Sequence, residues 1–174
     1  MPQTDLPWPH YCIDGFMHPD KFARHSARAR KLGEPQGGYD NIIREFLDYD
    51  PAPEIGEMIN WFTEKRGYTQ LKKLIHYAVT PAGLDHPMHH EGDHKIMSAV
   101  LYLHPEDNGG TVIYNPDKSF SYEVEWKPNR LFVFCGKSDV THHSYYSTST
   151  RYTLNYFLVD PSNITNESLL EKFI

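Results

Sequence analysis

The stretch RYTLNYFL (residues 151–158) alternates between two kinds of side chain, which is the pattern of a β-strand. One face is apolar and aromatic and carries Tyr152, Leu154, Tyr156 and Leu158. The other face carries Arg151, Thr153 and Asn155. A buried arginine is costly in an apolar core, so this second face is expected to line a polar cavity. The strand therefore predicts a sheet with helices on one face and a cavity on the other.

Arg151 and Thr153 together predict a receptor for a carboxylate, because both side chains leave the strand on the inward face. A guanidinium presents a fixed fork of donors, and the threonine hydroxyl adds a further hydrogen bond. The alternative is that Arg151 is an ion-pair partner at a strand edge. The inward direction favours the binding of a small anionic molecule.

Six further segments after Leu71 are predicted to be strands, separated by turns rich in Gly, Pro and Asn. They are residues 75–80, 96–103, 111–114, 121–126, 131–135 and 143–146. Many short strands of this kind indicate an antiparallel sandwich or barrel. With the helices of the first third, the expected class is α+β, with helices packed on an antiparallel double-sheet barrel.

The first third of the chain is predicted to be helical after a short strand at residues 11–13. Apolar residues recur at three- and four-residue spacing in residues 20–32, 41–49 and 53–67. The first two helices are separated by Gly33–Gly38, which is either a simple connector or a lid that closes over substrate.

The composition is that of a folded protein of single-domain size, with 174 residues, 39% hydrophobic and 23% charged. The formal net charge of −6 comes without a basic stripe, so nucleic acid is not an expected partner. No apolar run approaches the roughly 20 residues that span a bilayer, and the N-terminus lacks a signal-peptide pattern. Cys12 and Cys135 are expected to be reduced thiols, and the chain to be cytoplasmic.

Histidines and carboxylates are crowded into the stretch HPMHHEGDHK (residues 86–95). A second pair, His142-His143, follows about fifty residues later. Neutral imidazole is the commonest ligand for borderline metals, and a carboxylate adds charge and an oxygen donor. A His-x-Glu with one distant histidine is the linear form of a two-His, one-carboxylate site. Such a site leaves coordination positions open, as oxygen chemistry at Fe(II) requires.

Read together, these residues resemble the Fe(II)- and 2-oxoglutarate-dependent dioxygenases, especially their prolyl 4-hydroxylase-like branch. The resemblance covers residues 77–158 best, with a further match at the opening stretch, residues 9–16. The matching motifs are His89-His90-Glu91 followed by Lys95, Ser98 and Tyr102-Leu103; Asn108-Gly109-Gly110-Thr111; Leu131-Phe132-Val133-Phe134; Thr141-His142-His143-Ser144; and Arg151-Tyr152-Thr153.

The resemblance implies a mainly β fold, a double-stranded β-helix (jelly-roll, cupin-like) barrel with N-terminal helices packed on the major sheet. The whole chain, residues 1–174, would be one oxygenase domain. Residues 1–70 would be its helical support region, residues 71–160 its jelly-roll core, and residues 161–174 a C-terminal tail or helix.

By the same resemblance, His89, Glu91 and His143 would hold Fe(II). The 2-oxoglutarate would bind Arg151, assisted by Thr153 and by the hydroxyls of Tyr77 and Tyr102. The family pattern has Asp where this chain has Glu91. The register with Lys95 and Ser98 favours Glu91 over Asp93, and the flanking Thr141 and Ser144 favour His143 over His142.

The implied reaction consumes O2 and 2-oxoglutarate, hydroxylates an unactivated C–H bond and releases succinate and CO2. The substrate would be a small molecule or a peptide, with a prolyl or other amino-acid-like group as the site of hydroxylation. The alternative is a cupin-like protein that binds a metal without turning over 2-oxoglutarate.

Overall fold

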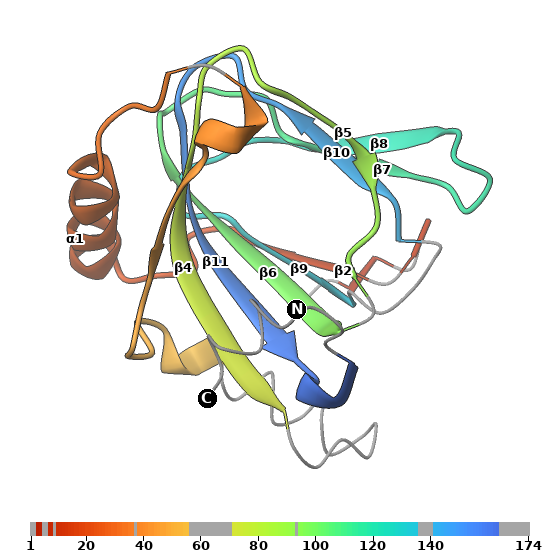
Figure 1. Ribbon diagram of the computed structural model, residues 1–174, viewed down its shortest axis with the longest axis horizontal. Coiled ribbons are helices and arrows are strands. Elements are labelled where there is room, and N and C mark those ends of the chain that lie inside the picture. Colours follow the sequence, from red (N-terminus) through yellow and green to blue (C-terminus); the bar gives the residue numbers. More distant parts are fainter. Residues whose placement is uncertain are drawn as a thin grey trace.

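The computed structural model describes residues 3–4, 7–8, 10–36, 38–55, 71–92, 94–135 and 141–163. These residues form two antiparallel sheets that face each other (Figure 1). The major sheet has the strand order β1 (Gln3–Thr4), β2 (His10–Ile13), β9 (Leu131–Cys135), β6 (Lys95–His104), β11 (Arg151–Val159), β4 (Lys72–Thr80) and β3 (Ile43–Phe46). The minor sheet has the order β5 (Asp85–His89), β10 (His143–Tyr146), β7 (Thr111–Tyr114) and β8 (Phe120–Val124).

Strand β11 is an interior strand of the major sheet, paired with β4 along one side and β6 along the other. Its apolar face joins the larger hydrophobic cluster through Tyr152, Leu154, Tyr156 and Leu158. Its opposite face lines the space between the two sheets with Arg151, Thr153, Asn155 and Phe157. The two-faced strand predicted from the sequence is therefore confirmed.

Helix α1 (Pro19–Arg30) packs on the outer face of the major sheet, against β4, β6 and β11 (Figure 1). Pro19 occupies its first turn, where a missing N–H costs nothing. The acidic Asp20 begins the helix, and Arg28 and Arg30 end it, so the charges complement the helix dipole. Ala29 is fully buried, and its small side chain allows the helix to approach the sheet closely.

The expectation of several N-terminal helices is wrong in one segment, because residues 41–49 do not form a helix. The chain makes a 3-10 turn, η1 (Tyr39–Asn41), and then continues as the edge strand β3. Strand β3 pairs with β4, with Ile43 opposite Val79 and Arg44 opposite Ala78. The apolar residues at 42–43 and 46–47 suit either period, and the open edge of β4 selects the strand.

The other predicted elements divide into confirmed strands and segments outside the described residues. All six further strands predicted beyond Leu71 are present, as β4, β6, β7, β8, β9 and β10, and the short strand at residues 11–13 is β2. Most of the third expected helix, residues 56–67, lies outside the described residues. So does most of the expected C-terminal tail, where only the 3-10 turn η2 (Pro161–Asn163) is described. Within the described ranges no helix is long and apolar enough to cross a membrane.

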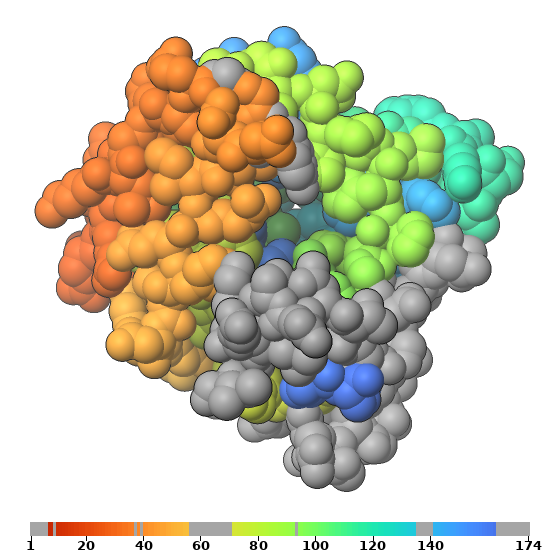
Figure 2. All heavy atoms as spheres, in the orientation of Figure 1, coloured from red at the N-terminus to blue at the C-terminus, as the bar shows by residue number. Residues whose placement is uncertain are grey.

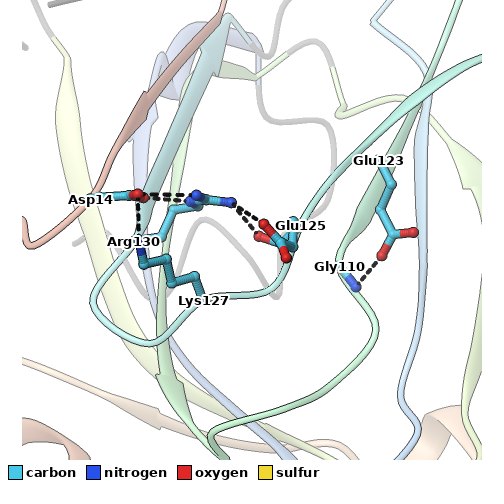
Figure 3. A network of polar contacts seen from close by, with 6 residues as sticks. All are labelled: Asp14, Gly110, Glu123, Glu125, Lys127 and Arg130. Carbon is cyan, nitrogen blue, oxygen red and sulfur yellow. Dashed lines mark hydrogen bonds and ion pairs between the residues drawn. The ribbon is translucent and has the colours of Figure 1, made fainter.

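An ion-pair network ties the end of β2 to the turn that leads into β9 (Figure 3). The Asp14 carboxylate accepts from Arg130 Nε at 2.6 Å and from Lys127 Nζ at 2.8 Å. The hydrogen bonds from Arg130 and Lys127 lower the pKa of Asp14 to about 2. The carboxylate is therefore charged at neutral pH and holds the two segments together.

Candidate active site

A cavity of about 330 Å³ lies between the two sheets. Figure 2 shows the hollow, bordered by the orange N-terminal segment and by the light-green segment that includes β5. Its major-sheet wall includes Ile42, Arg44, His76, Ala78, Thr80, Val100, Phe132, Phe134, Arg151, Thr153, Asn155 and Phe157. Its other wall includes His86, His89, His90, Glu91, Thr111, His143 and Tyr145. The volume is at the lower end of the range for small-molecule sites.

His89 and His143 face each other on neighbouring strands of the minor sheet. They are direct partners in the β5–β10 pairing, and their ring centroids are 4.2 Å apart. His89 Nδ1 lies 2.9 Å from the Pro87 carbonyl oxygen, and His143 Nδ1 lies 3.3 Å from that of Thr141. A carbonyl only accepts, so each of these contacts is made by a protonated Nδ1. In the neutral form of such a ring, Nε2 is the nitrogen whose lone pair can bind a metal.

Strand alternation separates His143 from its neighbour His142. His143 lines the cavity and is 6% exposed, whereas His142 packs edge-on against His90 with the ring centroids 5.7 Å apart. Burial lowers the pKa of His143 to about 4, although the charge of Glu91 opposes the shift. His143 is therefore neutral at pH 7, in the form that binds a metal.

Glu91 is a buried carboxylate that remains ionised. Its Oε2 lies 2.5 Å from Lys95 Nζ, and its Oε1 accepts from Ser98 Oγ at 3.0 Å. Burial raises the pKa of Glu91, but the charge of Lys95 and the hydrogen bonds from Lys95 and Ser98 outweigh it, together with the His143 ring in its acid, protonated form, and lower the pKa to about 2. The two residues that set the register in the sequence are thus the partners of this carboxylate.

The three side chains fit a metal in their chemistry, although the carboxylate is directed elsewhere. Within the described ranges, no three His, Cys, Asp or Glu side chains already form a group that could hold a metal ion. Glu91 instead bonds to Lys95 and Ser98. Two imidazoles and one ionised carboxylate are nevertheless donors that suit a divalent first-row metal. His89, His143 and Glu91 are therefore the residues that would hold it; Asp93 lies outside the described residues.

Arg151 is a buried cation, 3% exposed, in the same cavity. Its Nη1 lies 3.3 Å from the carbonyl oxygens of Gly109 and Gly110, and its Nη2 lies 3.4 Å from Thr111 Oγ1. Its guanidinium also lies over three aromatic rings, those of Tyr145 at 4.3 Å, Trp126 at 4.9 Å and Tyr102 at 5.1 Å.

No carboxylate within the part of the chain that the structure describes forms an ion pair with Arg151, and Glu123 acts on its charge only from a longer distance. Burial lowers the pKa of Arg151, although the rings of Tyr102 and Tyr145 oppose this shift. A guanidinium nevertheless stays protonated in proteins. A buried charge costs several kcal/mol unless an opposite charge compensates it. The arrangement therefore provides a site for an anion.

The glycine turn before β7 supplies the two carbonyl oxygens that contact Arg151. A Cβ on Gly109 would overlap the Tyr146 carbonyl oxygen, and one on Gly110 would overlap the Val124 carbonyl oxygen. The Gly110 N–H donates to Glu123 Oε1 at 2.7 Å (Figure 3). Both positions therefore accept only glycine. The hydrogen bond to Glu123 holds the turn in place, with the carbonyl groups of Gly109 and Gly110 directed at Arg151.

Three other residues were expected to assist the co-substrate, and the structure places two of them near Arg151. Thr153 lines the cavity two positions along β11 from Arg151, on the same face of the strand. The Tyr102 hydroxyl lies 2.7 Å from Thr111 Oγ1, and the Tyr102 ring stacks on Trp126. The sequence pattern gave no site role to Thr111, Trp126 or Tyr145. Thr111 appears only as the end of the Asn108-Gly109-Gly110-Thr111 motif, and Trp126 and Tyr145 belong to no motif.

The expectation for Tyr77 is wrong. Its side chain lies in the outer hydrophobic cluster, and its hydroxyl contacts His25 Nδ1 of α1 at 2.5 Å. The residues of β4 that line the cavity are His76, Ala78 and Thr80, so alternation directs Tyr77 to the helix side. In the strand pairing Tyr77 is opposite Leu154, on the apolar face of β11, and this register was not available from the sequence.

Comparison with solved structures shows that the chain has the fold of oxygenases described as dependent on Fe(II) and 2-oxoglutarate, the prolyl hydroxylases among them. The sequence itself matches no protein-family model and no curated protein.

Three solved structures illustrate the likeness. A prolyl-4-hydroxylase from Pseudomonas putida has a TM-score of 0.66 and 19% identity, with 86% of this chain and 91% of that chain covered. The viral collagen prolyl hydroxylase from Paramecium bursaria Chlorella virus-1 has a TM-score of 0.61 and 14% identity, with 86% and 89% covered. The epimerase SnoN, in complex with Fe3+, alpha-ketoglutarate and a nogalamycin compound, has a TM-score of 0.64 and 14% identity, with 92% and 84% covered.

Proposed function

We propose that this chain is an Fe(II)- and 2-oxoglutarate-dependent oxygenase built on a double-stranded β-helix. It hydroxylates an unactivated C–H bond of a prolyl or other amino-acid-like substrate and releases succinate and CO2. The observation that carries the proposal is the buried Arg151, which has no carboxylate partner within the described ranges and opens onto the same cavity as His89 and His143. The fold supports the same reaction class.

Each residue of the site has a defined task in this proposal. Bound iron would supply the activation of O2 that converts 2-oxoglutarate to succinate and CO2 while one oxygen atom enters the substrate. Arg151 and Thr153 bind the far carboxylate of 2-oxoglutarate and so direct its 2-oxo acid end toward His89 and His143. The rings around Arg151 exclude water and strengthen this ion pair.

Lys95 and Ser98 are the positioning residues for Glu91 in the proposal. They keep the carboxylate ionised, so it needs to lose no proton before it binds a metal. Among the residues that the structure describes, Oε1 accepts a hydrogen bond from Ser98 alone, which leaves it a lone pair for a metal.

The decisive experiment separates co-substrate binding from turnover. Purified protein is loaded with Mn(II) and titrated with 2-oxoglutarate without O2, and succinate is then measured with Fe(II) in air. We expect 2-oxoglutarate to bind the loaded protein, and Arg151→Gln to weaken that binding at least about tenfold, the value of a hydrogen-bonded charge pair. Metal affinity should be unchanged in this variant. Unchanged 2-oxoglutarate affinity in Arg151→Gln would rule out the proposed role.

The second candidate function is a cupin-like metal-binding protein that does not turn over 2-oxoglutarate. The observation in its favour is that Lys95 and Ser98 hold the Glu91 carboxylate. This candidate predicts metal binding that is indifferent to the inert analogue N-oxalylglycine. A titration of the Mn(II)-loaded protein with that analogue distinguishes the two functions.

A further inference from the structure

The cavity is positively charged although the chain is acidic. The charged residues that line it, among those the structure describes, are the cations Arg44, Lys95 and Arg151 and the single carboxylate Glu91. The formal net charge of the whole chain is −6, so the positive lining does not follow from the overall composition. A concave site of one sign focuses the field and attracts ligands of the opposite charge.

Arg44 is the cation in this lining that the proposed reaction does not use. Alternation along β3 directs Ile42 and Arg44 to the cavity, while Glu45 on the other face binds Arg28 of α1 at 2.8 Å. Arg44 has no carboxylate partner among the described residues. Its guanidinium is therefore available to a ligand at the cavity wall.

The position of Arg44 separates it from the co-substrate site. In the sheet register, Arg44 is opposite Ala78, and Ala78 is opposite Thr153. Two strand spacings put the Cα atoms of Arg44 and Thr153 about 10 Å apart. The methyl group of Ala78 is all that β4 contributes to the row between them, so no large β4 side chain separates Arg44 from Thr153.

We propose that Arg44 binds a carboxylate of the primary substrate, which is therefore a small free acid, such as an amino acid, and not an internal residue of a peptide. This inference rests on the proposed oxygenase function. In the proposed site one carboxylate of 2-oxoglutarate pairs with Arg151 and the other end faces the metal, so neither compensates the charge of Arg44, which is left for a second anion. The small cavity volume suits a compact acid better than a chain segment.

The alternative role for Arg44 is protection against aggregation. Strand β3 is an edge strand, and inward-pointing charges on edge strands discourage edge-to-edge pairing. If Arg44 only prevented aggregation, acids and neutral ligands would bind the cavity with the same affinity. A substrate-binding role distinguishes acids from neutral ligands, and the experiment is designed around that distinction.

The test uses the protein loaded with Mn(II) and N-oxalylglycine, so that no turnover is required. The twenty common amino acids and their carboxamides are each titrated by calorimetry. We expect at least one amino acid to bind, its carboxamide to bind about tenfold more weakly or worse, and Arg44→Gln to remove that difference. Arg44→Lys keeps the charge and should recover part of the affinity. Arg24→Gln, an exposed arginine on α1, is the matched control and should behave as wild type.

The outcomes distinguish failure of the proposed oxygenase function from failure of the role of Arg44 alone. If N-oxalylglycine does not bind the metal-loaded protein, the proposed function itself fails, and this inference fails with it. If N-oxalylglycine binds, three results overturn the inference alone: no amino acid binds, acids and carboxamides bind equally, or Arg44→Gln leaves the acid affinity unchanged. Weaker N-oxalylglycine binding in Arg44→Gln would assign Arg44 to the co-substrate and would also overturn it.

Discussion

Single residues in this chain take their roles from the direction in which a strand presents them. His142 and His143 are adjacent in sequence and chemically identical, yet only His143 lies opposite His89 across the β5–β10 pair. In the same way, Tyr77 and His76 are neighbours on β4, and only His76 faces the cavity. A motif supplies the residue types, and the pleat selects which of them can act together.

The first prediction therefore compares the two adjacent histidines. His143→Ala should weaken Mn(II) affinity by more than about 100-fold, because removing a ligand costs more than the 10–100-fold typical of an outer-shell partner. His142→Ala is the matched control and should bind Mn(II) nearly as well as wild type. Equilibrium dialysis measures both affinities. Equal losses in the two variants would contradict the assignment of His143.

Whole elements show where the sequence pattern was ambiguous. Strand β5 (Asp85–His89) was not expected, because Pro87 and a run of histidines resemble a polar loop more than a strand. Its strand conformation comes from pairing with β10, a partner more than fifty residues away. Strand β3 became an edge strand for the same reason, since pairing with β4 decided between two periods that its sequence allowed equally.

The second prediction concerns the glycine turn that supports Arg151. Gly110→Ala should lower the free energy of unfolding by about 1–3 kcal/mol, because the added Cβ meets a backbone carbonyl that cannot yield. It should also weaken 2-oxoglutarate binding, since the Gly110 carbonyl contacts Arg151. Urea unfolding and an anaerobic titration measure the two effects. Gly38→Ala, where a Cβ meets nothing within 4 Å, is the control.

The third prediction concerns the ion pairs that anchor β2 to the turn before β9. The pKa of Asp14 is about 2 in the folded protein and near 4 in an unfolded chain. Its contribution to stability is therefore complete above pH 4 and is lost as the pH falls toward 2. Because the side chain is 44% exposed, the contribution should stay below about 1 kcal/mol.

Asp14→Asn should accordingly reduce the free energy of unfolding at pH 7, and the difference from wild type should shrink as the pH falls from 4 through 2. Urea titrations of both proteins across this range measure the difference. The exposed Asp107→Asn serves as the control variant, and it should match wild type throughout. A deficit in Asp14→Asn that persists undiminished at pH 2 would show that the effect is not electrostatic.

At the scale of the whole molecule, the two sheets create a cavity that neither could form alone. One wall brings Arg151 and Thr153 from the major sheet, and the other brings His89 and His143 from the minor sheet. A ligand that touches both walls should therefore stabilise the whole fold. That residues 1–174 act as a single domain remains a prediction.

The fourth prediction follows from this arrangement. At 100 times its dissociation constant, a ligand that binds only the folded state adds about 2.7 kcal/mol, which should raise Tm by several degrees in a chain of this size. Differential scanning calorimetry should show one increment with Mn(II) and a second with N-oxalylglycine. In Arg151→Gln only the first increment should remain. Loss of both increments would indicate that the variant has damaged the metal site as well.

The sequence by itself determined the residue types of the site and most of the strands, but not β3 or β5. Alternation within residues 151–158 was enough to place Arg151 and Thr153 on a cavity face, because side-chain direction in a strand is a local property. Only the tertiary structure decided which histidine faces His89, that Tyr77 points away, and that Glu91 is held by Lys95 and Ser98. These facts depend on strand register and on contacts between segments far apart in the chain, which no local pattern encodes.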